Sequence, residues 1–188
     1  MFIPAGVRLL IPLIVSFFYG EVSTNIINAN SYNKPLNFSC QSGDFLKNIS
    51  SIHSNKHEDR KWSFTCHQLP TDIITERCTW TAYFINRFDR PMLYQCPGDS
   101  FINGFRSFHR DREEDRIWKV QCCHMRGYHR NNCGFTWYLN HFDGQLQYSV
   151  PDGKYIHGIH SIHNNYFEDR IFAFEACSFV KDNTCETK

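Results

Sequence analysis

The sequence lacks an excess of charge of either sign. Its 20 Lys and Arg residues face 19 Asp and Glu residues, so the formal net charge at pH 7 is +1. Proteins that hold nucleic acid through a general electrostatic footprint carry a marked positive excess. We therefore expect no nucleic-acid partner, and charge-based recognition has to come from a local cluster.

Long apolar runs are missing after the first twenty residues. The run from Leu9 to Phe18 follows a positive charge at Arg8 and precedes a small residue at Gly20, as in a secretory signal. It is too short to span a bilayer comfortably. We predict a signal peptide over residues 1–20, a domain over 21–188 without a membrane span, and secretion to the matrix or extracellular fluid.

Enzyme signatures are absent as well. The sequence contains no nucleophile–base arrangement, no Gly-rich phosphate loop and no HExxH motif. We expect no catalytic residue, no cofactor and no metal. His53, His109 and His163 share one repeat position, and we expect ordinary half-exposed side chains there, not a metal site on a common axis.

The sequence contains one short motif three times. The motif consists of a glutamate, then Asp-Arg, then an aromatic residue two positions after the arginine. The Asp residues stand 56 and then 54 positions apart, a spacing typical of repeat architectures. The three copies align with one another without gaps over about residues 40–66, 96–122 and 150–177. The block residues are Glu58, Asp59, Arg60 and Trp62, then Glu114, Asp115, Arg116 and Trp118, then Glu168, Asp169, Arg170 and Phe172.

The alternation within these blocks favours β-strands. Trp62, Phe64 and Cys66 would share one face of an extended segment. The stretches between the copies also resemble one another, which favours a closed body over an open solenoid. We predict a single all-β, disulfide-rich domain of three pseudo-symmetric repeats, β-trefoil or β-prism-like, with a two-sheet β-sandwich as the alternative.

A mainly structural role is expected for the blocks. Neighbouring residues on a strand point to opposite faces, so Asp59 cannot easily pair with Arg60. The expected arrangement is an Arg60 side chain held between Glu58 and the face of Trp62. The alternative is an Arg-carboxylate-aromatic sugar site in every repeat.

Nine cysteines indicate an oxidising compartment and a disulfide framework with one thiol left over. The third copy has Val150 at the position of Cys40 and Ala176 at the position of Cys66. Two cysteines that are missing together are what a bonded pair predicts. Each such bond closes a loop of about 27 residues, worth about 3.5 kcal/mol in the chain-entropy model. The predicted pairs are Cys40–Cys66, Cys96–Cys122, Cys78–Cys123 and Cys133–Cys177, with Cys185 unpaired and available for a disulfide-linked dimer.

The candidate ligand surface is a local basic stripe in the second copy. Arg106, Phe108, Arg110 and Arg112 would lie on one strand face, with Arg126 and Arg130 nearby. Arginine pairs bidentately with sulfate and carboxylate groups, so the stripe would suit a charged polysaccharide. The alternative is a solvated stretch neutralised by Asp111, Glu113, Glu114 and Asp115.

Two sequons, at Asn37 and Asn48, are expected N-glycosylation sites on a secreted surface.

A family resemblance rests on four features taken together. They are Tyr94-Gln-Cys-Pro-Gly98, the Glu-Asp-Arg blocks, the Cys122-Cys123 doublet and the closing Cys177…Cys185. In this combination the chain resembles the dermatopontin family over nearly all of its mature length.

The resemblance implies a secreted, non-enzymatic matrix and adhesion protein. Expected partners are proteoglycans, glycosaminoglycans or cell-surface glycans, and matrix proteins. The alternative that it implies is a lectin or agglutinin acting in defence or cell aggregation. This chain departs from the family in lacking a cysteine over Met125–His129, which agrees with an unpaired Cys185.

Overall fold

The computed structural model describes residues 27–182, and every regular element in that range is a β-strand. The predicted signal peptide and Cys185 lie outside the described residues. Within residues 27–182 no helix is long and apolar enough to cross a membrane. The strands are β1 (Ile27–Asn28), β2 (Leu36–Ser39), β3 (Asp44–Ser54), β4 (Asp59–Gln68), β5 (Thr75–Trp80), β6 (Met92–Gln95), β7 (Ser100–Arg110), β8 (Asp115–Met125), β9 (Tyr128–Phe135), β10 (Leu146–Ser149), β11 (Lys154–Asn164) and β12 (Asp169–Lys181).

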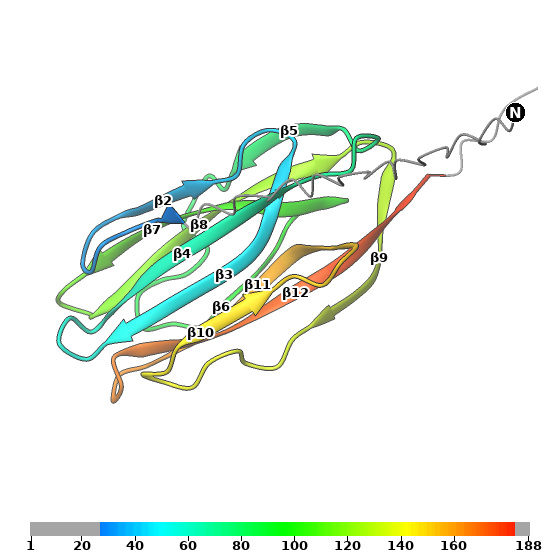
Figure 1. Cartoon of the computed structure of the whole chain (residues 1–188). Helices are drawn as coiled ribbons and strands as arrows, with labels where there is room; N and C mark the ends of the chain where they lie inside the picture. Colours follow the sequence, from blue (N-terminus) through cyan, green and yellow to red (C-terminus); the bar gives the residue numbers. More distant parts are fainter. Residues whose placement is uncertain (1–26, 183–188) are drawn as a thin grey trace, which may run out of the picture.

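Three four-stranded sheets make up the molecule, with the orders β1-β4-β3-β10, β2-β7-β8-β5 and β6-β11-β12-β9 (Figure 1). Each sheet is centred on one antiparallel hairpin of long strands, and each hairpin is one sequence repeat. The prediction of an all-β domain with three pseudo-symmetric repeats is confirmed. Three separate sheets correspond to its β-prism-like form, not to a two-sheet sandwich.

A bulge interrupts each hairpin at the same repeat position. The register shifts fall between Leu46 and Asn48, between Ile102 and Gly104, and between Ile156 and Gly158. Bulges bend a strand and increase its twist, which lets each long hairpin curl around a common centre.

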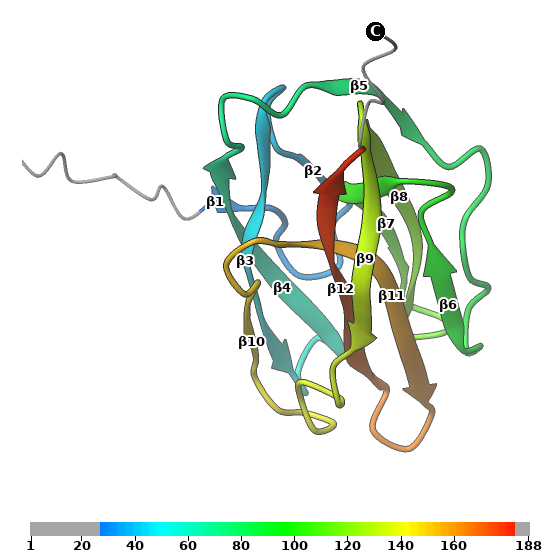
Figure 2. The same cartoon turned by 90° about the vertical axis from the view of Figure 1, so that its right-hand side faces the viewer.

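Short strands exchange between the repeats and close the body. β2 precedes the first hairpin but pairs with β7 of the second, and β6 precedes the second but pairs with β11 of the third. β10 precedes the third hairpin and returns to β3 of the first (Figure 2). Because each short strand satisfies an edge of another repeat, the three sheets form one cyclic unit.

The two ends of the described chain behave differently. The amino-terminal segment pairs with β4, and Ala29 N donates to Trp62 O as Ile85 N does to Trp118 O in the second repeat. At the other end, residues 178–181 continue β12 and pair with β9.

Aromatic side chains from all three sheets fill the main core. Trp62 lies 5.2 Å from Trp118 and 5.0 Å from Phe172, and the Trp118 and Phe172 centroids are 6.0 Å apart. All three contacts are edge-to-face, the geometry that aromatic quadrupoles prefer. One aromatic from each repeat thus meets the other two at the pseudo-threefold axis.

Four disulfides join Cys40–Cys66, Cys96–Cys122, Cys78–Cys123 and Cys133–Cys177. These are the four pairs that the repeat alignment predicts. Two tie the short strands to the hairpins that follow them in the chain, and two tie edge strands β5 and β9 to β8 and β12.

Candidate functional site

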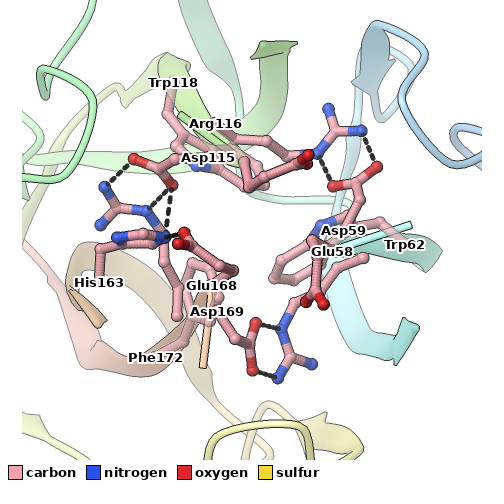
Figure 3. Close-up of a pocket in the computed structure, with 13 residues that line it drawn as sticks. Glu58, Asp59, Trp62, Asp115, Arg116, Trp118, His163, Glu168, Asp169 and Phe172 are labelled. Atoms are coloured by element: carbon pink, nitrogen blue, oxygen red, sulfur yellow. Dashed lines mark hydrogen bonds and ion pairs between the residues drawn. The ribbon is translucent and has the colours of Figure 1, made fainter. Parts of the chain in front are cut away.

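Three buried Asp–Arg pairs join the repeats in a ring around the axis (Figure 3). Each arginine donates through Nε and a terminal nitrogen to both carboxylate oxygens of an Asp in another repeat, at 2.6–2.7 Å. All six side chains belong to residues at most 4% exposed. The pairs are Arg60 with Asp169, Arg116 with Asp59, and Arg170 with Asp115.

The predicted arrangement of Arg60 between Glu58 and Trp62 is wrong. Its guanidinium binds Asp169 and also donates to Ser51 Oγ. Consecutive residues do point in opposite directions, and this is why the Asp of each block binds one neighbouring repeat while its Arg binds the other. The Asp and Arg that stand next to each other in a block therefore link their repeat to both of its neighbours and close the ring.

The interior of the ring is too small for a sugar. The cavity among the block residues measures about 20 Å³, room for roughly one water molecule. Trp62 and Trp118 each leave an indole Nε1 without a hydrogen-bond partner within the described chain. The alternative prediction of a sugar site in every block therefore fails on the pseudo-threefold axis, because a sugar ring does not fit there.

The three equivalent histidines are buried, which corrects the expectation of half-exposed side chains. The side chains of His53, His109 and His163 are at most 1% exposed. Burial lowers the pKa of His53, but the Asp169 and Asp143 carboxylates outweigh it and the pKa is raised. Each histidine faces carboxylates from its surroundings.

The glutamates of two blocks also carry perturbed pKa values. Burial raises the pKa of Glu114 and of Glu168, and repulsion from nearby acidic groups, including Glu58, raises both further. The rim of the ring is therefore rich in negative charge.

The predicted basic stripe lies on the outer face of β7. Arg106, Phe108 and Arg110 are exposed, while Ser107 and His109 between them are buried. The prediction that Arg112 shares this strand face is wrong, because β7 ends at Arg110 and Arg112 stands in the following turn with 89% of its side chain exposed.

Aromatic rings lie beneath the cations of this face. The guanidinium carbon of Arg106 is 4.0 Å from the Trp80 ring centroid, and that of Arg110 is 4.1 Å from Phe88. Lys119, opposite Arg106 in the ladder, places its ammonium 5.3 Å from the Phe84 ring. We name this surface, formed by Trp80, Phe84, Phe88, Arg106, Phe108, Arg110 and Lys119, the cation–aromatic face.

Lys119 was missed in the sequence because it is isolated there. Only the β7–β8 register brings it beside Arg106. The signal that predicts it is the hairpin itself, since cross-strand partners on one face lie about 5 Å apart.

Acidic residues neutralise only part of the stripe. Glu113 pairs with Arg110 and lies 3.9 Å from Arg112. Asp115 binds Arg170, and Glu114 faces His109. Within the described chain no carboxylate lies within ion-pair distance of Arg106, whose Nε donates to Asn37 Oδ1, or of Lys119, whose Nζ donates to the Ala82 carbonyl.

Arg126 and Arg130 do not join this face. Both follow β8 at the opposite end of the hairpin, since Ser100 pairs with His124, about 20 Å along β7 from Arg106. Arg126 lies 3.4 Å from Glu76, and Arg130 contacts His157 Nε2 and the Gly98 carbonyl. The structure thus divides the predicted set into two places.

The two sequons differ in their surroundings. Asn37 is exposed on β2 and accepts from Arg106, so a glycan there would stand beside the cation–aromatic face. Asn48 is half-buried and donates to Thr65 Oγ1.

An aromatic groove in the third repeat was not predicted. It has a volume of about 480 Å³ and is lined mainly by Trp137, Tyr138, Phe142 and Phe167. Trp137 is 93% exposed, and Phe142 stacks on Phe167 at 5.0 Å. Its sequence signal is the aromatic-rich connecting stretch, where Trp137 occupies the place of Tyr83 in the preceding connector.

Comparison with known proteins assigns the family. The family model described as Dermatopontin matches residues 30–181. The chain belongs to the dermatopontin family. The match spans all three repeats and all four disulfides of the described chain.

Relatives in the dermatopontin family carry different names. The chain is 38% identical over 168 residues to a hemagglutinin/amebocyte aggregation factor of Limulus polyphemus, with 88% of this chain and 95% of that protein covered. It is 35% identical to Millepora cytotoxin-1 of Millepora dichotoma, covering 79% of this chain and 65% of the cytotoxin. It is 33% identical to a dermatopontin of Biomphalaria glabrata, covering 77% and 95%. No solved structure matches the chain.

Proposed function

We propose that this protein is a secreted, non-enzymatic matrix and adhesion protein that binds glycosaminoglycan chains through the cation–aromatic face. Membership of the dermatopontin family and the four disulfides support an extracellular role. The observation that carries the proposal is Arg106 and Lys119, two adjacent cations over aromatic rings without a carboxylate partner in the described chain.

The other repeats argue for specificity of this face. At the position of Arg106 they have Ser50 and His160, and at that of Lys119 they have Ser63 and Ala173. The same scaffold thus presents cations at these two positions in one repeat of three. Sulfate and carboxylate groups would bind the guanidinium and ammonium, and sugar rings would pack on the flanking aromatics.

Heparin affinity chromatography tests the proposal. Arg106→Ala combined with Lys119→Ala is expected to elute at clearly lower salt than the parent protein, because two unpaired cations are lost. Arg126→Ala combined with Arg130→Ala is the matched control, since it also removes two cations, at the far end of the same hairpin. Equal elution of the double variant and the parent would reject the face.

A second candidate function is a lectin that binds neutral sugars, and the exposed groove around Trp137 favours it. Sugar-binding surfaces use aromatic rings against the apolar faces of pyranoses. Trp137, 93% exposed, lies in a contiguous surface with Tyr138, Phe142 and Phe167, and exposed apolar patches of this kind mark interaction sites. The similarity to a hemagglutinin supports agglutination as its readout.

Agglutination of red cells separates the two candidates. Trp137→Ala is expected to abolish agglutination that a neutral monosaccharide inhibits, without changing heparin elution. Tyr83→Ala is the control, because it removes an 85% exposed aromatic at the equivalent connector position. Agglutination unaffected by Trp137→Ala would exclude the groove.

A further inference from the structure

One of the two sequons lies in a strand that the fold carries to another repeat. Asn37 stands in β2, which precedes the first hairpin in the chain and pairs with β7 of the second. In the register of these two strands its partner is Arg106, 69 residues away in the sequence. The glycosylation sequence of one repeat is therefore placed on the cationic surface of the next.

The Asn37 side chain is held in one orientation. Its Oδ1 accepts a hydrogen bond from Arg106 Nε at 2.8 Å. The hydrogen bonds of residues 27–182 include none from its Nδ2, the atom to which an N-glycan is attached. The flanking Leu36 and Phe38 are buried, so the strand is anchored in the core. A glycan on Nδ2 starts from a fixed point beside the guanidinium.

The neighbours of Asn37 on the outer side of the sheet belong to the cation–aromatic face. Arg106 is directly opposite, and Phe108, 49% exposed, is the diagonal neighbour two residues along β7. Directly paired side chains lie about 5 Å apart and diagonal ones about 7–8 Å. Lys119 follows on the far side of Arg106, as its cross-strand partner in β8. The first sugars of a glycan can therefore reach both cations and the Phe108 ring.

The other two exchanged strands lack this combination. The residues equivalent to Asn37 are Leu93 in β6 and Gln147 in β10, and their cross-strand partners are His160 and Ser50. Neither of these strands contains an N-x-S/T sequence. Of the three short strands, the one with a sequon is thus the one that adjoins cations without a carboxylate partner.

The second sequon gives a comparison within the chain. Asn48 lies in β3 of another sheet, where its cross-strand partners are the uncharged Thr65 and Ser149. Its Nδ2 donates to Thr65 Oγ1 at 2.7 Å, so the attachment atom is already engaged. A glycan at Asn48 lies away from the cation–aromatic face, which is in the sheet of β7 and β8.

We propose that an N-glycan on Asn37 covers Arg106 and Lys119 and keeps glycosaminoglycan chains from binding there. The inference rests on the proposed function of this face and adds its regulation. The core of an N-glycan is uncharged, so both cations stay charged, but sulfate and carboxylate groups on a long polymer lose the close range that charge-assisted hydrogen bonds need. Secreted chains with an unmodified Asn37 are the binding form.

Heparin chromatography of the protein secreted from a glycosylating eukaryotic host tests the proposal. Ser39→Ala removes the sequon but keeps Asn37 and its contact with Arg106, and we expect elution at clearly higher salt than for the parent protein. Ser50→Ala removes the Asn48 sequon in the same way and should elute with the parent. Mass spectrometry of the parent's fractions should find the glycan on Asn37 in the chains that heparin retains least.

Asn37→Asp separates loss of the glycan from exposure of the cation. It also removes the sequon, but it places a carboxylate where the amide oxygen accepts from Arg106, and the pair neutralises that cation. We therefore expect Asn37→Asp to elute at lower salt than Ser39→Ala.

The proposal is overturned by any of three results. They are secreted chains that carry no glycan on Asn37, equal elution of Ser39→Ala and the parent, and equal elution of Ser39→Ala and Asn37→Asp. Failure of the face itself gives a different pattern. In the Ser39→Ala background, Arg106→Ala with Lys119→Ala should lower the elution salt, and no change there would reject the face. A lowered value there, with Ser39→Ala itself eluting like the parent, would leave the face in place and reject only its regulation.

Discussion

At the scale of single residues, the Asp-Arg step is the decisive feature. Two consecutive side chains that point in opposite directions reach two different repeats, so Asp59 binds Arg116 while Arg60 binds Asp169. A buried ion pair adds little net stability compared with apolar packing, but removing one of its two charges leaves the other buried and unpaired, which is strongly destabilising. The ring therefore specifies which repeat lies next to which.

Breaking one pair should be much worse than replacing it. Asp115→Ala leaves the guanidinium of Arg170 buried and unpaired, and we expect a loss of about 3–5 kcal/mol in the free energy of unfolding. The double variant Asp115→Leu with Arg170→Met removes both charges and should lose less. Urea unfolding measures both, and a double variant less stable than the single one would contradict this account.

Tyr155 predicts a sensitivity to alkaline pH. It is buried beside Phe45 and Phe101, and burial raises its pKa above 10.0. Because the folded state favours the neutral phenol, stability is complete below the unfolded pKa and falls as the pH rises through the folded pKa. Tyr155→Phe, the residue found at this place in the other repeats, should weaken the decline between about pH 10 and 12, measured by urea midpoints.

At the scale of elements, the short exchanged strands decide the architecture. β2, β6 and β10 each pair with a hairpin other than the one they precede, and each lies against the bulged part of its partner. Close backbone approach is needed there. A Cβ on Gly104 would lie 2.7 Å from the Phe38 carbonyl oxygen of β2.

Gly104→Ala should therefore push β2 away from β7. We expect a loss of about 1–3 kcal/mol, the usual cost of overpacking a tight contact. Gly134→Ala in edge strand β9 is the control, since a Cβ there meets nothing within 4 Å. Equal unfolding midpoints for the two variants would show that β2 yields without cost.

At the scale of the whole molecule, closure combines strand exchange, the charged ring and disulfides. The third repeat lacks the disulfide that the first two have, with Val150 and Ala176 at the cysteine positions, both buried. The cyclic fold thus does not require a bond at this position in every repeat.

This internal precedent predicts a tolerated double replacement. Cys40→Val with Cys66→Ala copies the third repeat, and we expect the protein to fold with a free energy of unfolding lower by about 3.5 kcal/mol, the loop-closure contribution of the lost bond. Thermal unfolding compares it with the parent. Failure to secrete a folded protein would show that Cys40–Cys66 is essential for closure.

The sequence by itself determined the three repeats, the strand class and the four cysteine pairs, because these depend on periodicity and on positions gained or lost together. The alternation that exposes Arg106, Phe108 and Arg110 was readable for the same reason. Contacts between residues of different repeats could not be read from the sequence. Arg60 with Asp169, Lys119 beside Arg106 and Asp143 against His53 depend on how the hairpins close on one another. No local pattern reports a contact made across ninety residues or more, or between two strands of unknown register. Tertiary structure alone therefore decided that the Glu-Asp-Arg blocks form a closed ring, and that the histidines are buried among its carboxylates.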